Sequence, residues 1–164
     1  LPASSAASDV YKRQILTGMN AERMLIAAEC IGDAKWFIQQ ARDYGCEREV
    51  FGRPIAQNQG IQFPIARAYS AMRSAELMLN EAFRMYEAGQ NPGEEANLAK
   101  LQSADASWQA AEACIQTFGG FGFATEYNIE RKYREARLYQ VAPISTNLIL
   151  SYIAEHVLKM PRSY

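Results

Sequence analysis

Apolar residues recur at helical spacing along almost the whole chain, whereas segments that alternate as strands do are scarce. The first long segment shows the pattern, because Met19, Ile26, Cys30 and Phe37 follow one another at intervals of seven, four and seven residues. Residues at these intervals lie on one face of an α-helix. The pattern predicts an all-α domain of long helices joined by short loops, most simply an up-and-down bundle.

Helix-breaking residues divide this pattern into five expected helices. Gly45 and Gly89 are placed to end the first two helices, and Pro143 is placed as the first residue of the last one. Pro64 falls in the first turns of the second helix, where proline is least costly. We expect helices from residue 17 or 20 to 44, and over 58–88, 94–117, 130–138 and 143–160.

Composition excludes several classes of protein. The chain has 164 residues, 49% of them apolar, and a formal net charge of −1, which predicts one globular domain and argues against nucleic acid as a partner. No apolar run reaches the roughly 18 residues of a membrane span. Three scattered cysteines predict reduced thiols, and a single histidine, His156, argues against a metal site.

The first 14 residues, LPASSAASDVYKRQ, differ from the rest in their small and Ser-rich composition. They match neither a signal peptide nor an amphipathic targeting helix. We expect residues 1–14 to be a foreign or disordered segment and residues 15–164 to form the domain. On this interpretation the chain is the tail end of a longer protein.

Two loops could bind a ligand. Gly119, Gly120 and Gly122 either end a helix and turn the chain, or allow a ligand phosphate or another subunit to approach the backbone. Arg48 could pair with a pyrophosphate through two hydrogen bonds, or form a solvated ion pair with a neighbouring glutamate.

Charged residues on two expected helices also have alternative explanations. The basic run over residues 130–137 contains glutamates, which favours a salt-bridged helix face over a nucleic-acid patch. Glu22 lies three residues after Met19 and four before Ile26, on the apolar face of the first helix. Partial burial there would raise the pKa of Glu22 and suit it to act as a general base, although an acidic residue in a first turn also stabilises the helix dipole.

Four segments carry a resemblance to a known family: GMNAERMLIAAECIG, the loop FGRPIAQNQ, the run IQTFGGFGFATEYNIERKYREARLYQ and the tail IAEHVL. Together, from about residue 15 to 164, they resemble the C-terminal helical domain of the acyl-CoA dehydrogenases. The resemblance implies an FAD flavoprotein that also has an N-terminal helical domain and a central β-domain. It further implies a homotetramer, a dimer of dimers, with this bundle at its centre.

The resemblance also implies roles for individual residues. Those matching contacts to the flavin nucleotide of a neighbouring subunit are Arg48, Phe51, Gln59, Gln116, Gly119 and Gly120. Ser145 and Asn147 match positions that touch the cofactor of the same subunit, and Arg23 matches an arginine beside the substrate.

The implied reaction is α,β-dehydrogenation of an acyl-CoA thioester, with electron-transfer flavoprotein as the electron acceptor. Many family members carry the catalytic base as the Glu of a Tyr-Glu-Gly-Thr run, where this chain has Pro143. The isovaleryl- and long-chain-type enzymes carry it on the first helix instead, at the position of Glu22. The resemblance therefore implies Glu22 as the base, in the bacterial cytoplasm or the mitochondrial matrix, and an inactive chain when isolated. A non-catalytic oligomerisation module and an acyl-CoA oxidase remain the alternatives.

Overall fold

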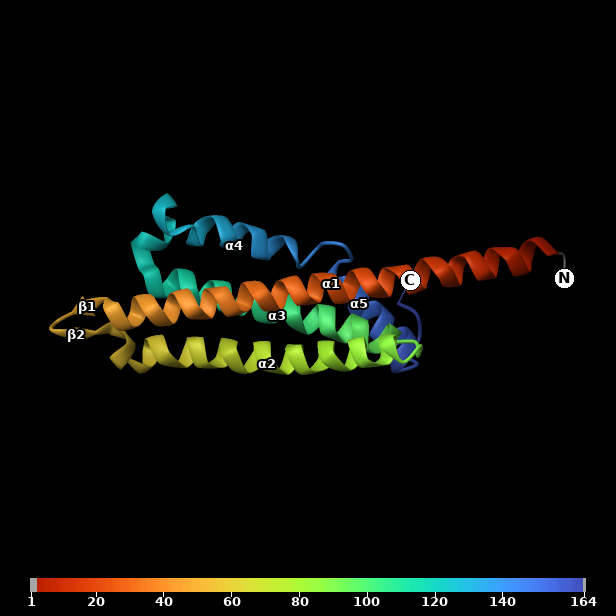
Figure 1. Cartoon of the computed structure of the whole chain (residues 1–164), viewed down its shortest axis with the longest axis horizontal. Helices are drawn as coiled ribbons and strands as arrows, with labels where there is room; N and C mark the ends of the chain where they lie inside the picture. Colours follow the sequence, from red (N-terminus) through yellow and green to blue (C-terminus); the bar gives the residue numbers. More distant parts are fainter. Residues whose placement is uncertain (1–2, 164) are drawn as a thin grey trace.

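The structure, a computed structural model, describes the backbone of residues 3–163 and the side chains of residues 18–163. Three long helices lie side by side and alternate in direction (Figure 1): α1 (Ala3–Glu47), α2 (Gln59–Glu87) and α3 (Gly93–Phe118). Helix α4 (Ile129–Leu138) packs on α1 and α3, on the side away from α2. Helix α5 (Thr146–Tyr152) lies toward the opposite end from the α1–α2 connection. The predicted all-α, up-and-down bundle is confirmed.

Short elements connect the helices. A two-stranded antiparallel hairpin, β1 (Glu49–Val50) and β2 (Arg53–Pro54), follows α1, and this hairpin was not expected from the sequence. The remaining elements are the 3₁₀ turns η1 (Ile55–Gln57), η2 (Gly119–Phe123) and η3 (Thr125–Tyr127) and the π-helical turn η4 (Ile153–Val157).

The core depends on small residues of α3 packed between α1 and α2. Phe37 of α1 and Leu79 of α2 are buried against it. Alanine lets helix backbones approach closely and has the highest helix propensity of the residues. The buried alanines of α3 are Ala96, Ala99, Ala104, Ala106, Ala110, Ala111 and Ala113.

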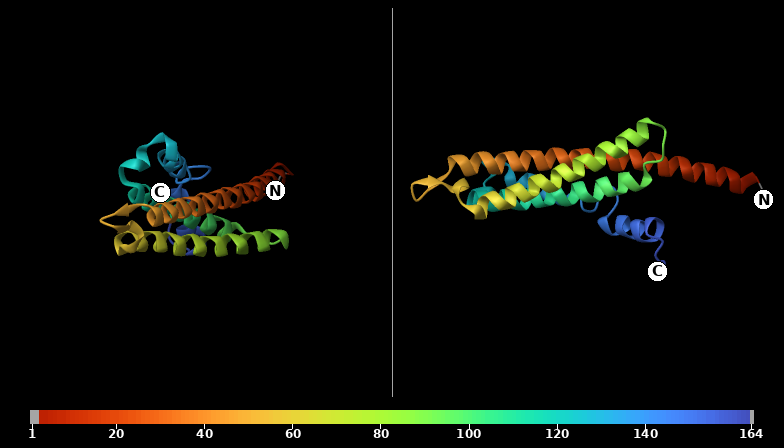
Figure 2. Two further views of the ribbon diagram at one scale, coloured as in Figure 1. Left: turned by 60° about the vertical axis from the view of Figure 1, so that its left-hand side comes forward. Right: turned by 90° about the horizontal axis from the view of Figure 1, so that it is seen from below.

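Helix α1 is longer than the sequence indicates at both ends. It begins at Ala3, so the expected start at residue 17 or 20 is wrong, and its first turns project past the rest of the bundle (Figure 2). Gly45 lies inside α1 and is buried, so the expected stop at this glycine is wrong. A Cβ atom on Gly45 would lie 3.5 Å from the Cβ of Ala56 and 3.8 Å from Thr117. The glycine therefore marks a close crossing of chain segments.

The other helix ends mostly follow the expectation, and the last helix is the exception. Gly89 and Gly119 both adopt positive φ angles, 71° and 58°, immediately beyond α2 and α3. Helix α5 begins at Thr146, with the Ser145 hydroxyl accepting a hydrogen bond from the Leu148 amide at 3.4 Å. Pro143 is therefore not the first helical residue but lies in the preceding loop, after a cis peptide bond. The Ser145 side chain thereby satisfies one of the first amides of α5, which have no partner within the helix.

Among the described residues, no helix is long and apolar enough to cross a membrane. The same part of the chain holds no group of three or more His, Cys, Asp or Glu side chains that could bind a metal ion.

Candidate functional site

The hairpin after α1 presents an aromatic side chain to solvent in an unusual conformation. Phe51 and Gly52 have φ angles of 53° and 76°, the pattern of a two-residue type I′ hairpin turn. Positive φ is costly for a bulky residue such as phenylalanine. The Phe51 side chain is nevertheless fully exposed, so no contact within the described chain compensates this strain. Such a residue is a candidate for contact with another molecule.

A cavity of about 530 Å³ opens where the end of α1 meets the end of α3. It brings together the Arg48 side chain and the glycine-rich turn η2, which are far apart in the sequence. Its walls are Tyr44, Arg48, Val50, Ile55, Thr117, Phe118, Gly120 and Phe121. Two of the residues predicted to bind the cofactor, Arg48 and Gly120, are thus placed at one site.

Arg48 lies at this cavity without a carboxylate partner. Within the described part of the chain, no acidic side chain lies within 4.0 Å of its guanidinium, so the ion pair with Glu47 or Glu49 does not form. The guanidinium instead lies over the Phe121 ring, 5.8 Å from its centroid. An exposed, unpaired guanidinium can bind an anion such as a diphosphate.

The three glycines near this cavity have different local requirements. Gly119 has positive φ and ends α3, which confirms the helix-capping interpretation for this residue. Gly122 is buried, and a Cβ there would lie 3.0 Å from Ile115 Cγ1 and 3.2 Å from the Ile115 carbonyl oxygen. Gly120 has neither requirement, because it is exposed and a Cβ there would meet nothing within 4 Å. The structure of the chain therefore does not explain this glycine, whereas close approach of a ligand or subunit would.

The two glutamines that were predicted to contact the cofactor do not line this cavity. Gln59 is the exposed first residue of α2, and it does not line the cavity that contains Arg48. Gln116 is exposed on α3 and lines a separate hollow with Pro64 and Glu112. The structure does not bring either glutamine to Arg48.

Ser145 and Asn147 lie at the beginning of α5, toward the other end of the bundle from the hairpin (Figure 1). Ser145 caps α5, and Asn147 is exposed. The predicted cofactor residues thus form two groups, one at the hairpin end and one at the α5 end. Ser145 and Asn147 are not among the residues that line the cavity of Arg48 and Gly120.

Glu22 and Arg23 of α1 differ sharply in exposure. Glu22 is exposed, so the expectation of a partly buried carboxylate on the apolar face is wrong for this chain. Arg23 is buried and its Nη1 donates a hydrogen bond to Asn20 Oδ1 at 2.9 Å, while its Nε has no partner among the described residues. Burial lowers the pKa of the Arg23 guanidinium, and the nearby Tyr152 and Glu22 oppose this shift.

Lys100 of α3 is a structural residue that sequence analysis missed. Its side chain is completely buried, and its Nζ donates hydrogen bonds to the carbonyl oxygens of Tyr139 at 2.6 Å and Ile144 at 2.8 Å. These bonds tie the loop that contains Pro143 to the bundle. The available signal was a lysine in an otherwise apolar, Ala-rich helix face, LAKLQSADA.

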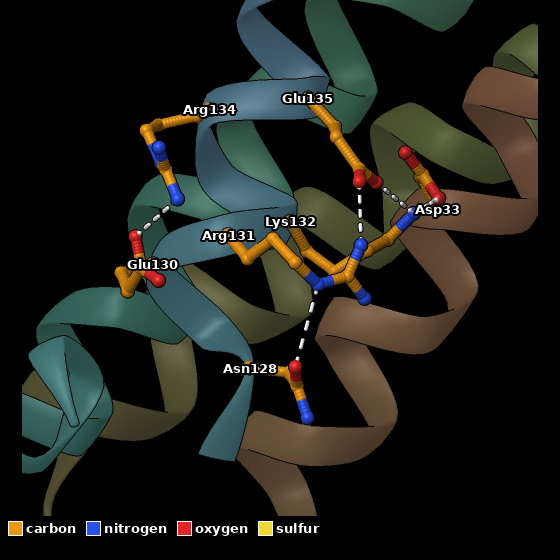
Figure 3. A network of polar contacts seen from close by, with 7 residues as sticks. All are labelled: Asp33, Asn128, Glu130, Arg131, Lys132, Arg134 and Glu135. Carbon is orange, nitrogen blue, oxygen red and sulfur yellow. Dashed lines mark hydrogen bonds and ion pairs between the residues drawn. The ribbon is translucent and has the colours of Figure 1, made fainter. Parts of the chain in front are cut away.

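The basic run on α4 is salt-bridged, as the sequence indicates (Figure 3). Arg134 pairs with Glu130 at 2.9 Å, and Arg137 lies over the Trp108 ring at 5.6 Å from its centroid. Lys132 reaches across to Asp33 of α1. Each basic side chain of α4 thus contacts a partner within the chain. The pairs are Arg131–Glu135, Lys132–Asp33, Lys132–Glu135, Arg134–Glu130 and Arg137–Trp108.

Solved structures of other proteins share the helical-bundle fold of this chain. A glutaryl-coenzyme A dehydrogenase in complex with glutaryl-CoA superposes with a TM-score of 0.84 at 27% identity, over 92% of this chain and 38% of that one. Butyryl-CoA dehydrogenase from Megasphaera elsdenii also gives a TM-score of 0.84, over 87% and 37% of the two chains, but at 24% identity this likeness shows the fold alone.

Sequence comparison gives the family. FadE12, an acyl-CoA dehydrogenase of Mycobacterium tuberculosis, is 36% identical over 168 aligned residues, covering 100% of this chain and 43% of that protein. This chain therefore spans less than half the length of that curated relative. The family model of the acyl-CoA dehydrogenase C-terminal domain matches residues 13–158. FAD is the cofactor of this family. The chain belongs to the acyl-CoA dehydrogenase family, as a C-terminal domain.

Proposed function

We propose that this chain is the C-terminal domain of an FAD-dependent enzyme that introduces an α,β double bond into an acyl-CoA thioester. The observation that carries the proposal is the cavity at the hairpin end, where Gly120 and the unpaired Arg48 lie together. A guanidinium beside an accessible glycine backbone suits the diphosphate of FAD. The residues present therefore fit this cofactor.

The separation of the two groups of predicted residues supports a shared site between subunits. Arg48 and Phe51 would contact the FAD of a neighbouring subunit, while Ser145 and Asn147 would contact the FAD of their own. The exposed tip residue Phe51 has the geometry for such a contact, because it projects from the hairpin without a partner in the described chain. We propose a homotetramer, a dimer of dimers, and expect sedimentation of this chain to show a dimer or larger. A monomer at micromolar concentration would contradict this assembly.

Glu22 would take the α-proton of the thioester, and the electron pair of that C–H bond would form the new double bond. When bound, FAD would supply the acceptor for the hydride of the β-carbon. The positively charged guanidinium of Arg23 would lie near the Glu22 carboxylate, on the same turn of α1. Glu22 is exposed in this chain, so the apolar surroundings that a base near neutral pH needs would come from the rest of the enzyme.

Pro143 supports a second candidate, a non-catalytic oligomerisation module. Its nitrogen carries no hydrogen, so this residue cannot donate a bond to the thioester oxygen as enolate charge develops. The exposed Glu22 also favours this candidate. Under our main proposal a different donor must serve the thioester oxygen.

Anaerobic reduction of FAD by acyl-CoA thioesters in the full-length enzyme tests the proposal. We expect a straight-chain or branched acyl-CoA to bleach the flavin, with electron-transfer flavoprotein restoring the oxidised absorbance. Bound FAD that no acyl-CoA of short, long or branched chain reduces would favour the non-catalytic module. Rapid reoxidation by oxygen would indicate an acyl-CoA oxidase.

A further inference from the structure

Hydrogen bonds on both sides hold the backbone of Arg48 in place, but little restrains its side chain. Its amide donates a hydrogen bond to the Tyr44 carbonyl at 2.8 Å, and its carbonyl accepts one from the Ile55 amide at 2.9 Å. The exposed side chain forms no ion pair with a described residue. A long side chain in this situation would sample many rotamers, and restricting them on binding would cost entropy.

The contact that does restrain the Arg48 side chain is the face of Phe121. The guanidinium carbon lies 5.8 Å from the ring centroid, within the range of a cation–π interaction. Phe121 belongs to η2, more than 70 residues later in the sequence, and lines the same cavity as Arg48. The contact thus joins the two chain segments that form the site.

Phe121 is itself held by a continuous set of aromatic contacts that begins in the core. Tyr44 and the buried Phe118 stack at a centroid distance of 4.1 Å. Tyr127 meets the Phe118 ring at 5.4 Å and the Phe121 ring at 5.9 Å, edge to face in both cases. Edge-to-face pairs at these distances are favourable, so Tyr127 links the Phe121 ring to the buried Phe118.

We propose that Phe121 is a positioning residue for Arg48, which presents the guanidinium to the diphosphate of FAD in a fixed orientation. The inference rests on the proposed function, because it takes FAD as the ligand of this cavity. A cation–π contact uses the positive charge of the guanidinium and not its N–H donors, so these donors stay available to an anion. A restrained guanidinium loses less entropy when the diphosphate binds.

Phe123 provides a matched control for Phe121. It lies two residues later in the same turn, is 71% exposed, and makes no ring contact with any residue in the described part of the chain. Leucine at either position removes an exposed aromatic ring. Only Phe121→Leu removes the surface over which Arg48 lies.

The first test measures the contact between Arg48 and Phe121 in this chain without any cofactor. The NMR signals of the Arg48 side chain should be displaced by the ring current of Phe121, and Phe121→Leu should abolish the displacement while Phe123→Leu preserves it. Phe121→Trp should retain it, because tryptophan offers a stronger cation–π surface. Arg48 signals that are identical in the wild type and Phe121→Leu would overturn the inference.

The second test measures FAD binding to the full-length apoenzyme by the change in flavin fluorescence. Phe121→Leu should raise the Kd about two- to fivefold, the size expected of an exposed cation–π contact, and Phe123→Leu should leave it unchanged. In an Arg48→Ala background, Phe121→Leu should have no additional effect. Thermal unfolding of each variant checks that the fold is intact.

The outcomes separate this inference from the proposed function. An undiminished effect of Phe121→Leu in the Arg48→Ala background would overturn the positioning role, because Phe121 would then act on FAD without Arg48. If Arg48→Ala weakens FAD binding but Phe121→Leu behaves like Phe123→Leu, the inference alone fails. If Arg48→Ala binds FAD as tightly as the wild type, the cofactor assignment of the cavity fails as well.

Discussion

Charged side chains at the two ends of the bundle lie in opposite environments. At the hairpin end, Arg48 is exposed and has no carboxylate partner among the described residues. At the α5 end, Arg23 and Lys100 are buried, and both donate hydrogen bonds to oxygens of the same chain. Burial of a cation is costly unless hydrogen bonds compensate it. The α5 end is therefore stabilised from within, while the hairpin end keeps its polar groups available to another molecule.

The largest expected effect concerns Glu22, an exposed acidic residue next to the buried Arg23 in the sequence. Glu22→Gln preserves the shape of the side chain but removes its basicity. In the full-length enzyme, we expect flavin reduction by acyl-CoA to slow by at least the ~100-fold typical of a lost general base. Anaerobic single-turnover bleaching measures this rate. Glu29→Gln, at another exposed position of α1, is the matched control. A Glu22→Gln rate within a few-fold of the wild type would place the base outside this chain.

The second prediction tests whether the α5 end depends on its buried lysine. Lys100→Met removes the donor to the Tyr139 and Ile144 carbonyls and leaves them unpaired. We expect the free energy of unfolding to fall by about 2 kcal/mol, the size of a lost hydrogen bond to a charged group. Urea unfolding of this chain gives the value. Lys35→Met, which breaks an exposed ion pair with Glu76, should cost less than about 1 kcal/mol. Equal losses in the two variants would contradict the assigned role.

The third prediction addresses the exposed arginines of the hairpin end. Arg48→Ala in the full-length enzyme should weaken FAD binding about tenfold, because it removes charge-assisted bonds to the diphosphate. Arg53→Ala should matter less, since Arg53 Nη2 already donates to Asn58 Oδ1 at 3.1 Å. Flavin retained after dilution and gel filtration measures the difference. Similar flavin retention by both variants would contradict the proposed difference between Arg48 and Arg53.

The fourth prediction separates two glycines that lie two residues apart. Gly122→Ala should destabilise this chain by about 1 kcal/mol or more, because the added Cβ would crowd Ile115. Gly120→Ala should leave stability within about 0.5 kcal/mol, since its Cβ points into open space. It should nevertheless weaken FAD binding in the full-length enzyme. Thermal unfolding and flavin titration give the two readouts, and unchanged FAD binding by Gly120→Ala would count against the cavity as the cofactor site.

The smallest effect is a dependence on pH at the α5 end. Burial lowers the pKa of the Lys100 ammonium below its unfolded value of roughly 10.4. Between these two pKa values the unfolded chain binds more protons than the folded chain, so stability rises with pH there. The stability advantage of the wild type over Lys100→Met should therefore increase as the pH rises toward about 10. Urea unfolding of both proteins at several pH values tests this. A stability advantage of the wild type that shrinks as the pH rises would contradict the predicted direction.

Patterns local in the sequence predicted most of the helices, and the motifs of the chain indicated its family. The helical period of the apolar residues predicted α2, α3 and α4 almost to their ends. Gly89 was predicted as a helix stop, and a helix end was one of the two alternatives for Gly119. Both signals depend on neighbours within one or two turns. The order of the quoted motifs gave the acyl-CoA dehydrogenase resemblance, which the family model confirms over residues 13–158.

Only the tertiary structure decided which residues are buried and which residues meet. Gly45 was expected to end α1, yet it lies within the helix at a crossing with Ala56 and Thr117. Glu22 was expected on a buried face and is exposed, while Lys100 is completely buried although lysine is rarely found in a core. Gly120 and Gly122 could not be distinguished from the sequence, because their difference lies in the space around a Cβ atom. Burial and contact depend on segments far apart in the chain, as the approach of Phe121 to Arg48 does, and a helical period carries no information about them.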